Sequence, residues 1–459
     1  MFNFKNIILK NPIFLFFIIF IVSRLFIHYV LEISTFELNY GYKLLDLNLL
    51  TNDFLKSILF LHAQTPGWNI INGLPAIILD GDVIKLTVFF NIFHSLLTFL
   101  IIYYSILISR EFNLSLKGQL IIFIFIFLHP TVIFYENFFD YNQISTFLFT
   151  QMSFFIVKFF KSNEKKYEIY IYLSLFVQGL FWAAFLPILI LFIFIVIRFF
   201  NKASLNLYLI VVTIFFVSLT PHIKNKVIFG VFTNSSKSLV DTSVMFPDWL
   251  DRCVSPEKKT DPNFKLFDNI EKYFPYYEKI YFKKYNKIIS HPAAVGKTSR
   301  HNNVAYFPIG ENCRKLTKKK IFEDPVFFFN DRFKSFLASH GKFGFDFMWP
   351  KPQGWNKYYK FLDDLYKNPK IKLTRQIIIF ILCMTVYLTL IYFILFSKKD
   401  IRLRKALFII GLLYAYVVTA CTLGTGVEQE RYIYTGFISN ILFVIIILKK
   451  FKSFTLKHI

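Results

Sequence analysis

The chain has 459 residues, of which 55% are hydrophobic and 62 are phenylalanine, and its mean hydropathy is +0.48. This composition exceeds what the core of a soluble domain needs, so it excludes an ordinary soluble enzyme. The formal net charge of +24 does not indicate a nucleic-acid partner, because the Lys and Arg residues form no single stripe and are concentrated between the apolar runs.

Apolar runs of about 15 to 25 residues recur along the chain, and this length crosses a hydrocarbon core about 30 Å thick. The first run follows a short basic start, as in a signal peptide, but no small-residue cleavage site follows it, so we expect a retained anchor. Roughly ten spans are predicted, at 12–31, 85–108, 119–134, 143–157, 167–181, 182–198, 206–221, 375–396, 406–424 and 432–448.

Short cytoplasmic loops concentrate Lys and Arg, which allows the threading to be tested. A cytoplasmic N-terminus places every short basic cluster on one side of the membrane. This agreement requires 167–198 to form two short spans that turn near 178–187, because a single crossing there would invert everything that follows. The clusters lie at 110–117, 158–166, 198–202, 398–405 and 449–457.

The threading predicts an all-α polytopic membrane protein with about ten transmembrane helices and a mainly helical soluble insertion on the non-cytoplasmic side. Its parts are an N-terminal transmembrane module at 1–221 with an external loop at 32–84, an external soluble or interfacial domain at 222–373, and C-terminal transmembrane helices at 374–459. In the external domain, 267–289 mixes aromatics with Lys and Glu at near-helical spacing. This helix either lies on the membrane or packs its aromatic stripe on its own domain.

Cys253 and Cys313 both fall in the external domain, where an oxidising compartment would allow them to form one bridge. The sequence contains no His/Cys cluster with zinc spacing, no phosphate-binding GxxxxGK[ST] loop and no GxSxG motif. It therefore offers no ATP site of its own.

Polar residues concentrate first in the external loop, where His62, Gln64 and Asn69 surround a Pro-Gly turn between two apolar stretches. This pattern suggests a binding site next to lipid. The alternative is an interfacial turn that Trp68 anchors and whose polar side chains face water.

A second concentration follows the third predicted span and contains Glu136, Asn137, Asp140 and Asn142. If this connection is helical, the two acids share a face, and they then repel unless a cation, a proton or a donor-rich substrate is nearby. The asparagines add hydrogen-bonding groups of the kind that a sugar site needs. The alternative is a solvated hairpin.

The third concentration is Glu428-Gln-Glu430-Arg431-Tyr432, on the external tip before the last span. Arg431 could bind the phosphate of a lipid-linked donor, since guanidinium pairs bidentately with phosphate oxygens. Arg24, near the outer end of the first span, could do the same. Each could instead reach lipid headgroups or pair with a nearby Glu. For Arg24 we favour these alternatives over phosphate binding.

These motifs together resemble the GT-C superfamily of membrane glycosyltransferases, which includes protein O-mannosyltransferases and the aminoarabinose transferases of lipid A. His62-Ala-Gln64-Thr-Pro66 resembles the HxQPP-type element of GT-C relatives, with Gly67 in place of the second Pro. His129-Pro130 with Glu136 resembles the end of their third span, and Glu428 to Tyr432 resembles the signature before their final helix. The usual acidic pair soon after the first span is absent.

The resemblance implies an inverting transfer of a sugar from a polyprenyl-phosphate donor to a glycan, lipid or protein acceptor on the non-cytoplasmic face. An acidic side chain would deprotonate or orient the acceptor hydroxyl; Asp46 is the first choice for this role, and Glu136 or Asp140 is the second. Arg431 would compensate the leaving phosphate, with Arg24 or His62. Substrate-binding residues are expected at Gln64, Asn69, Asn137 and Glu430. No cofactor is required; a divalent metal is possible but not indicated.

Two other functions stay open. A transporter, flippase or ligase for polyprenyl-linked glycans would share the spans, although transporters place ionisable groups near the membrane midplane, where only His94 lies here. A non-catalytic membrane assembly protein would have polar clusters that are merely solvated. The composition favours the bacterial inner membrane and cell envelope, with the endoplasmic reticulum as the alternative. The expected partners are the lipid bilayer, the donor and the acceptor, and no nucleic acid.

Overall fold

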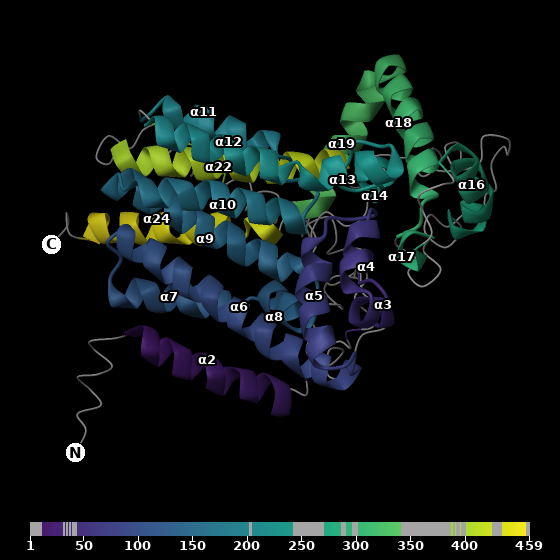
Figure 1. Ribbon diagram of the computed structural model, residues 1–459. Helices are drawn as coiled ribbons and strands as arrows, with labels where there is room; N and C mark the ends of the chain where they lie inside the picture. Colours follow the sequence, from purple (N-terminus) through teal and green to yellow (C-terminus); the bar gives the residue numbers. More distant parts are fainter. Residues whose placement is uncertain are drawn as a thin grey trace, which may run out of the picture.

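The computed structural model describes residues 12–30, 44–201, 204–241, 270–285, 291–295, 302–340, 401–424 and 434–455, with a few single positions between them. These ranges are built from helices and contain no β-strand (Figure 1). The predicted all-α class is therefore confirmed for this part of the chain.

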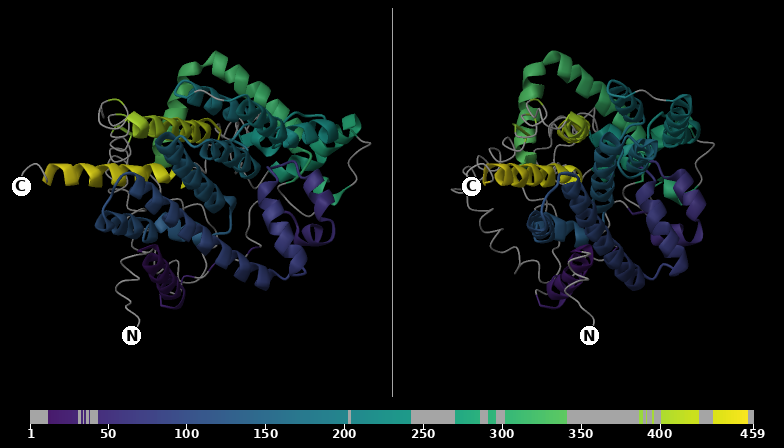
Figure 2. Two further views of the ribbon diagram at one scale, coloured as in Figure 1. Left: turned by 60° about the vertical axis from the view of Figure 1, so that its left-hand side comes forward. Right: turned by 90° about the vertical axis from the view of Figure 1, so that its left-hand side faces the viewer.

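The long helices run side by side in one bundle (Figures 1 and 2). Within the described ranges, four are long and apolar enough to cross a membrane: Val83–Glu111, Tyr141–Ser162, Leu205–Phe229 and Ile401–Ala420. A fifth is added if the bent pair Leu116–Phe127 and Thr131–Asn137 is one span. Most of the other predicted spans coincide with shorter helices, and 375–396 lies almost wholly outside the described residues. The bundle helices are α2 (Pro12–Tyr29), α6 (Val83–Glu111), α7 (Leu116–Phe127), α8 (Pro130–Asn137), α9 (Tyr141–Ser162), α10 (Lys165–Phe181), α11 (Ile188–Arg198), α12 (Leu205–Ser218), α13 (Thr220–Phe229), α22 (Ile401–Gly424) and α24 (Ile438–Thr455).

The stretch 167–198, on which the threading depends, folds back on itself. Helices α10 and α11 are separated by six residues that include Pro187, and Glu168 at the start of α10 forms an ion pair with Arg198 at the end of α11. Tyr172 and Phe194 also meet edge to face at 5.9 Å between ring centroids. The two helices are therefore antiparallel, as the charge pattern predicted.

The basic loops meet at one end of the bundle, which we call the basic end. Lys158 Nζ lies 2.7 Å from Glu111 Oε1, and Arg402 donates to the Lys161 carbonyl at 3.1 Å. Further contacts across this end join Asn201 to Asn163, Lys405 to Phe200 and Lys449 to Phe112. Five sequence regions that were grouped only by their charge are thus neighbours in space.

The opposite end, which we call the far end, carries the short helices. They lie partly across the bundle axis (Figure 1) and comprise α3 (Leu47–Asn52), α4 (Phe54–Phe60), α5 (Gly67–Ile78), α14 (Lys237–Asp241), α16 (Ile270–Tyr285), α17 (Pro292–Val295), α18 (Tyr306–Glu323) and α19 (Pro325–His340). Phe229, Tyr281, Val304 and Phe307 form a small apolar core of their own here. Helix α16 falls within 267–289, and its buried Tyr277 and Tyr281 show that its aromatic stripe packs on this region.

Short polar residues fix where the bundle helices begin. Asp82 accepts hydrogen bonds from the backbone N–H groups of Ile84 and Lys85 at the start of α6, and the bond from Lys85 lowers the pKa of its carboxyl. Asp140 caps α9 in the same way through the N–H of Tyr141. Both caps lie at helix starts that face the far end. Helix capping by itself therefore explains why these two carboxylates lie at this end.

Candidate functional site

A buried ion pair joins α2 to α8. The Arg24 guanidinium donates to both carboxylate oxygens of Glu136, at 2.5, 2.8 and 3.1 Å, and Ser95 of α6 donates to the same carboxylate at 2.7 Å. Arg24 is 6% exposed and Glu136 is 1% exposed. Arg24 therefore pairs with a Glu, one of the two alternatives to phosphate binding that we favoured from the sequence, and the Glu136 carboxylate is already held by four hydrogen bonds.

His94 connects this pair to helix α5. Its Nδ1 lies 3.2 Å from the carbonyl of Tyr135, next to Glu136, and its ring meets Trp68 of α5 edge to face at 6.1 Å. His94 is fully buried, and its Nε2 has no hydrogen-bond partner among the described residues. A polar histidine at the contact between α5 and α6 thus links the loop to the ion pair.

Asp140 and Glu136 do not share a helical face. Helix α8 ends at Asn137, and the backbone is extended at Phe138 before α9 begins. The Asp140 carboxylate accepts from the backbone N–H of Tyr141 at 2.6 Å and from the Asn142 side chain at 2.8 Å. The two acids are thus engaged separately, and Asp140 shapes the start of α9.

The neighbouring amides are buried but incompletely satisfied. Asn137 Nδ2 donates to the Ile133 carbonyl at 2.8 Å, while the Oδ1 atoms of Asn137 and Asn142 have no partner among the described residues. Gln143 bonds both Thr98 and Tyr434, and Tyr434 stacks on Tyr135 at 4.5 Å. The start of α9 is therefore a polar region inside the bundle that α6, α8 and the Tyr434–Gly436 turn surround.

Asn69 and Asp46 are brought together by the backbone of the first loop. Asn69 is fully buried, and its Oδ1 accepts from the N–H of Leu45 at 2.8 Å, which holds the residue directly before Asp46. Asp46 caps α3 by accepting from Asn48 N–H at 2.8 Å and is partly exposed. Of the three predicted acids, Asp46 is thus the most accessible.

His62 lies in a different cluster, which we call the His62 junction: His62, Ala63, Ser235, Ser236 and Asn302. His62 Nδ1 lies 2.8 Å from Ser236 Oγ, and Asn302 Oδ1 accepts from the N–H groups of His62 and Ala63 at 2.8 and 2.9 Å. The His62 ring contacts Phe229 and Phe307 at 4.7 and 4.8 Å. His62 is fully buried, so it ties the first loop to residues about 170 to 240 positions later instead of facing water.

Two further side chains strengthen the His62 junction. Lys224 of α13 donates to the carbonyl of Leu61, and Ser235 donates to the carbonyl of Ala63 at 2.5 Å. Asn234 extends the contact to the turn between α10 and α11 through the carbonyl of Ala183, at 3.0 Å. Ser236, Asn302 and Lys224 were not predicted, because no local spacing relates them to His62.

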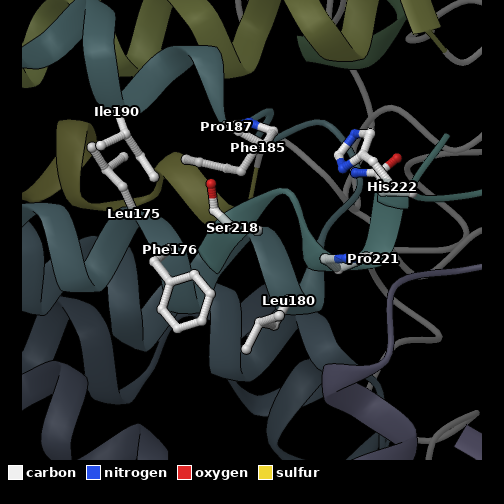
Figure 3. Close-up of a pocket in the computed structure, with 11 residues that line it drawn as sticks. Leu175, Phe176, Leu180, Phe185, Pro187, Ile190, Ser218, Pro221 and His222 are labelled. Carbon is white, nitrogen blue, oxygen red and sulfur yellow. The ribbon is translucent and has the colours of Figure 1, made fainter. Parts of the chain in front are cut away.

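A hollow beside this turn is too small to be a sugar site. Figure 3 shows Leu175, Phe176 and Leu180 around it, with His222 at one edge. Its enclosed volume of about 10 Å³ holds no more than one water. The hollow is therefore a small packing gap between α10 and the α12–α13 break and is too small for a substrate.

The remaining predicted residues either lie outside the described ranges or are not brought into the site. Gln64 is half-buried in the first loop, whereas Glu430 and Arg431 lie outside the described residues. Cys313 is buried and disulfide-bonded, and its expected partner Cys253 also lies outside the described residues. Among the residues that the structure describes, no group of three or more His, Cys, Asp or Glu side chains could hold a metal.

Comparison with known protein families, curated proteins and solved structures finds no match to this chain.

Proposed function

We propose that this protein is a membrane glycosyltransferase that moves a sugar from a polyprenyl-phosphate donor to an acceptor at the far end of the bundle. The observation that carries the proposal is the connection from Asp46, through Asn69 and Trp68 of α5, to His94 and the buried Arg24–Glu136 pair. Ionisable side chains buried among apolar helices are costly and usually serve function. Here the buried His94, Arg24 and Glu136 support Asp46, a partly exposed acid beside the membrane.

In this proposal Asp46 is the base. Its carboxylate takes the proton from the acceptor hydroxyl, the hydroxyl oxygen attacks the anomeric carbon, and the bond from that carbon to the phosphate oxygen breaks. Arg431 compensates the charge of the departing polyprenyl phosphate. Glu136, held by Arg24 and Ser95, and Asp140, which caps α9, position the surrounding helices.

The proposed location is the bacterial inner membrane, with the far end facing outward and about ten spans in total. The gathering of the basic loops at the other end supports this orientation, since short basic loops stay in the cytoplasm. The disulfide at Cys313 also supports it, because disulfides persist in oxidising compartments.

The test uses the full chain in proteoliposomes with polyprenyl-phosphate mannose and polyprenyl-phosphate aminoarabinose as donors and a serine-containing peptide as the acceptor hydroxyl, and it measures release of polyprenyl phosphate. We expect Asp46→Asn and Arg431→Gln each to lower turnover by at least about 100-fold while insertion stays normal. Asp53→Asn is the matched control, because Asp53 is an exposed acid of the same loop.

Full activity in Asp46→Asn, Glu136→Gln, Asp140→Asn and Arg431→Gln would contradict an enzyme at this site. Movement of the intact donor across the bilayer without its consumption would instead favour the transporter or flippase. No donor binding at all would favour a non-catalytic assembly protein.

A further inference from the structure

Helix α19 and the end of α18 carry an exposed apolar stripe. Val326, Phe329 and Phe333 are spaced by three and four residues, which places them on one face of α19, and Phe322 lies in the last turn of α18 just before it. Their exposed fractions are 85%, 68%, 68% and 57%. We call these four residues the α19 stripe.

Another face of α19 is packed. Phe328 is 8% exposed and Arg332 is 4% exposed, and α19 lies against α22, one of the four helices able to cross a membrane. Figure 2 shows the green α19 beside the yellow-green α22. The stripe is therefore largely exposed at a position next to a span.

Water is an unfavourable environment for this surface. Burying a Phe or Val side chain is worth about 1.5–3 kcal/mol, and large contiguous apolar patches mark sites that contact a partner or a membrane. We propose that the α19 stripe lies in the lipid leaflet on the far side of the membrane, with the helix axis along the surface.

The length of the helix fits this position. Sixteen residues of α-helix extend about 24 Å, which is shorter than the hydrocarbon core of about 30 Å. The helix also contains Asp331, Arg332 and Lys334, which a lipid-crossing segment would avoid. A short helix that combines exposed apolar residues with charged residues is typical of a segment that lies in the interface.

The charge of α18 identifies lipid as the partner. This helix exposes Arg314, Lys315, Lys318 and Lys319, against two exposed acids on the same helix. Each basic residue near an anionic surface adds about 1 kcal/mol to membrane attraction. A basic helix that leads directly into an apolar stripe thus matches anionic headgroups above acyl chains. This inference does not depend on the proposed transferase activity.

The test places a bimane label on the full chain in nanodiscs of phosphatidylcholine and phosphatidylglycerol, with Cys383→Ala and Cys421→Ala as background. The label is attached through Phe329→Cys, with Val326→Cys as a second position and Lys315→Cys as the exposed control on α18. The chain without an introduced cysteine measures labelling elsewhere. We expect doxyl-labelled lipid to quench the label at 329 at least about twofold more than at 315, and aqueous iodide to show the reverse order.

Equal quenching by iodide at 329, 326 and 315 would overturn the proposal, because the stripe would then face water. Shielding from both quenchers would also overturn it, since protein would then cover the stripe; particle mass would show whether a second copy does so. Loss of transferase activity with unchanged quenching would leave this inference intact.

Discussion

The two ends of the bundle are held together by different kinds of contact. At the basic end, Glu111 at the end of α6 meets Lys158 and Lys161 near the end of α9, and these side chains are partly exposed. At the far end, His62, Ser236 and Asn302 form buried hydrogen bonds between segments far apart in the sequence. At the basic end, a side chain that loses its partner can bind water instead. At the far end, a group that loses its partner stays buried without one.

The largest effect is expected from the Arg24–Glu136 pair. Arg24→Met leaves a buried carboxylate without its cation, which should lower the free energy of unfolding by about 3–5 kcal/mol. Glu136→Met added to Arg24→Met should recover much of this loss, because no buried charge then remains. Thermal unfolding in detergent measures both. A double variant as unstable as Arg24→Met alone would show that the pair does not act as a unit.

The next effect concerns the His62 junction. Asn302→Ala removes the acceptor of two backbone N–H groups and a donor to the carbonyls of Phe60 and Ala293, so we expect a loss of about 2–4 kcal/mol. Hydrogen exchange at the His62 and Ala63 amides should accelerate with it. Asn312→Ala on α18 is the control. Unchanged exchange at 62 and 63 would contradict the role of Asn302.

The third effect concerns Glu168, which is buried in an ion pair at the basic end. Glu168 accepts from Arg198 and, at 2.7 Å, from the Tyr172 hydroxyl. Glu168→Gln should cost about 1–3 kcal/mol by weakening charge-assisted hydrogen bonds between α10 and α11. Glu164→Gln, on the exposed acid directly before α10 begins, should change the melting temperature little. Equal effects would mean that burial does not set the difference.

The sequence predicted the features that depend on local pattern. The fold-back of 167–198 followed from loop charge, and the helical class followed from apolar runs. The pairing of Arg24 with some Glu could be anticipated, but the choice of Glu136, 112 residues away, could not. The shared face of Glu136 and Asp140 required a continuous helix, and α8 stops between them. Asn302, 240 residues from His62, left no local signal at all.

The smallest effect should come from the exposed basic contacts. Lys158 and Glu111 have side chains that are 32% and 18% exposed, so water and salt compete with their attraction. Lys158→Ala should therefore lower the free energy of unfolding by less than about 1 kcal/mol, because a partly exposed ion pair gains little over solvated charges. The same comparison at high salt should show a smaller difference still, whereas the loss in Asn302→Ala should persist, since neutral buried hydrogen bonds are not screened. A salt-independent loss in Lys158→Ala as large as that in Asn302→Ala would remove the distinction between the two ends, and would mean that the basic loops pack the bundle as tightly as the far-end helices do.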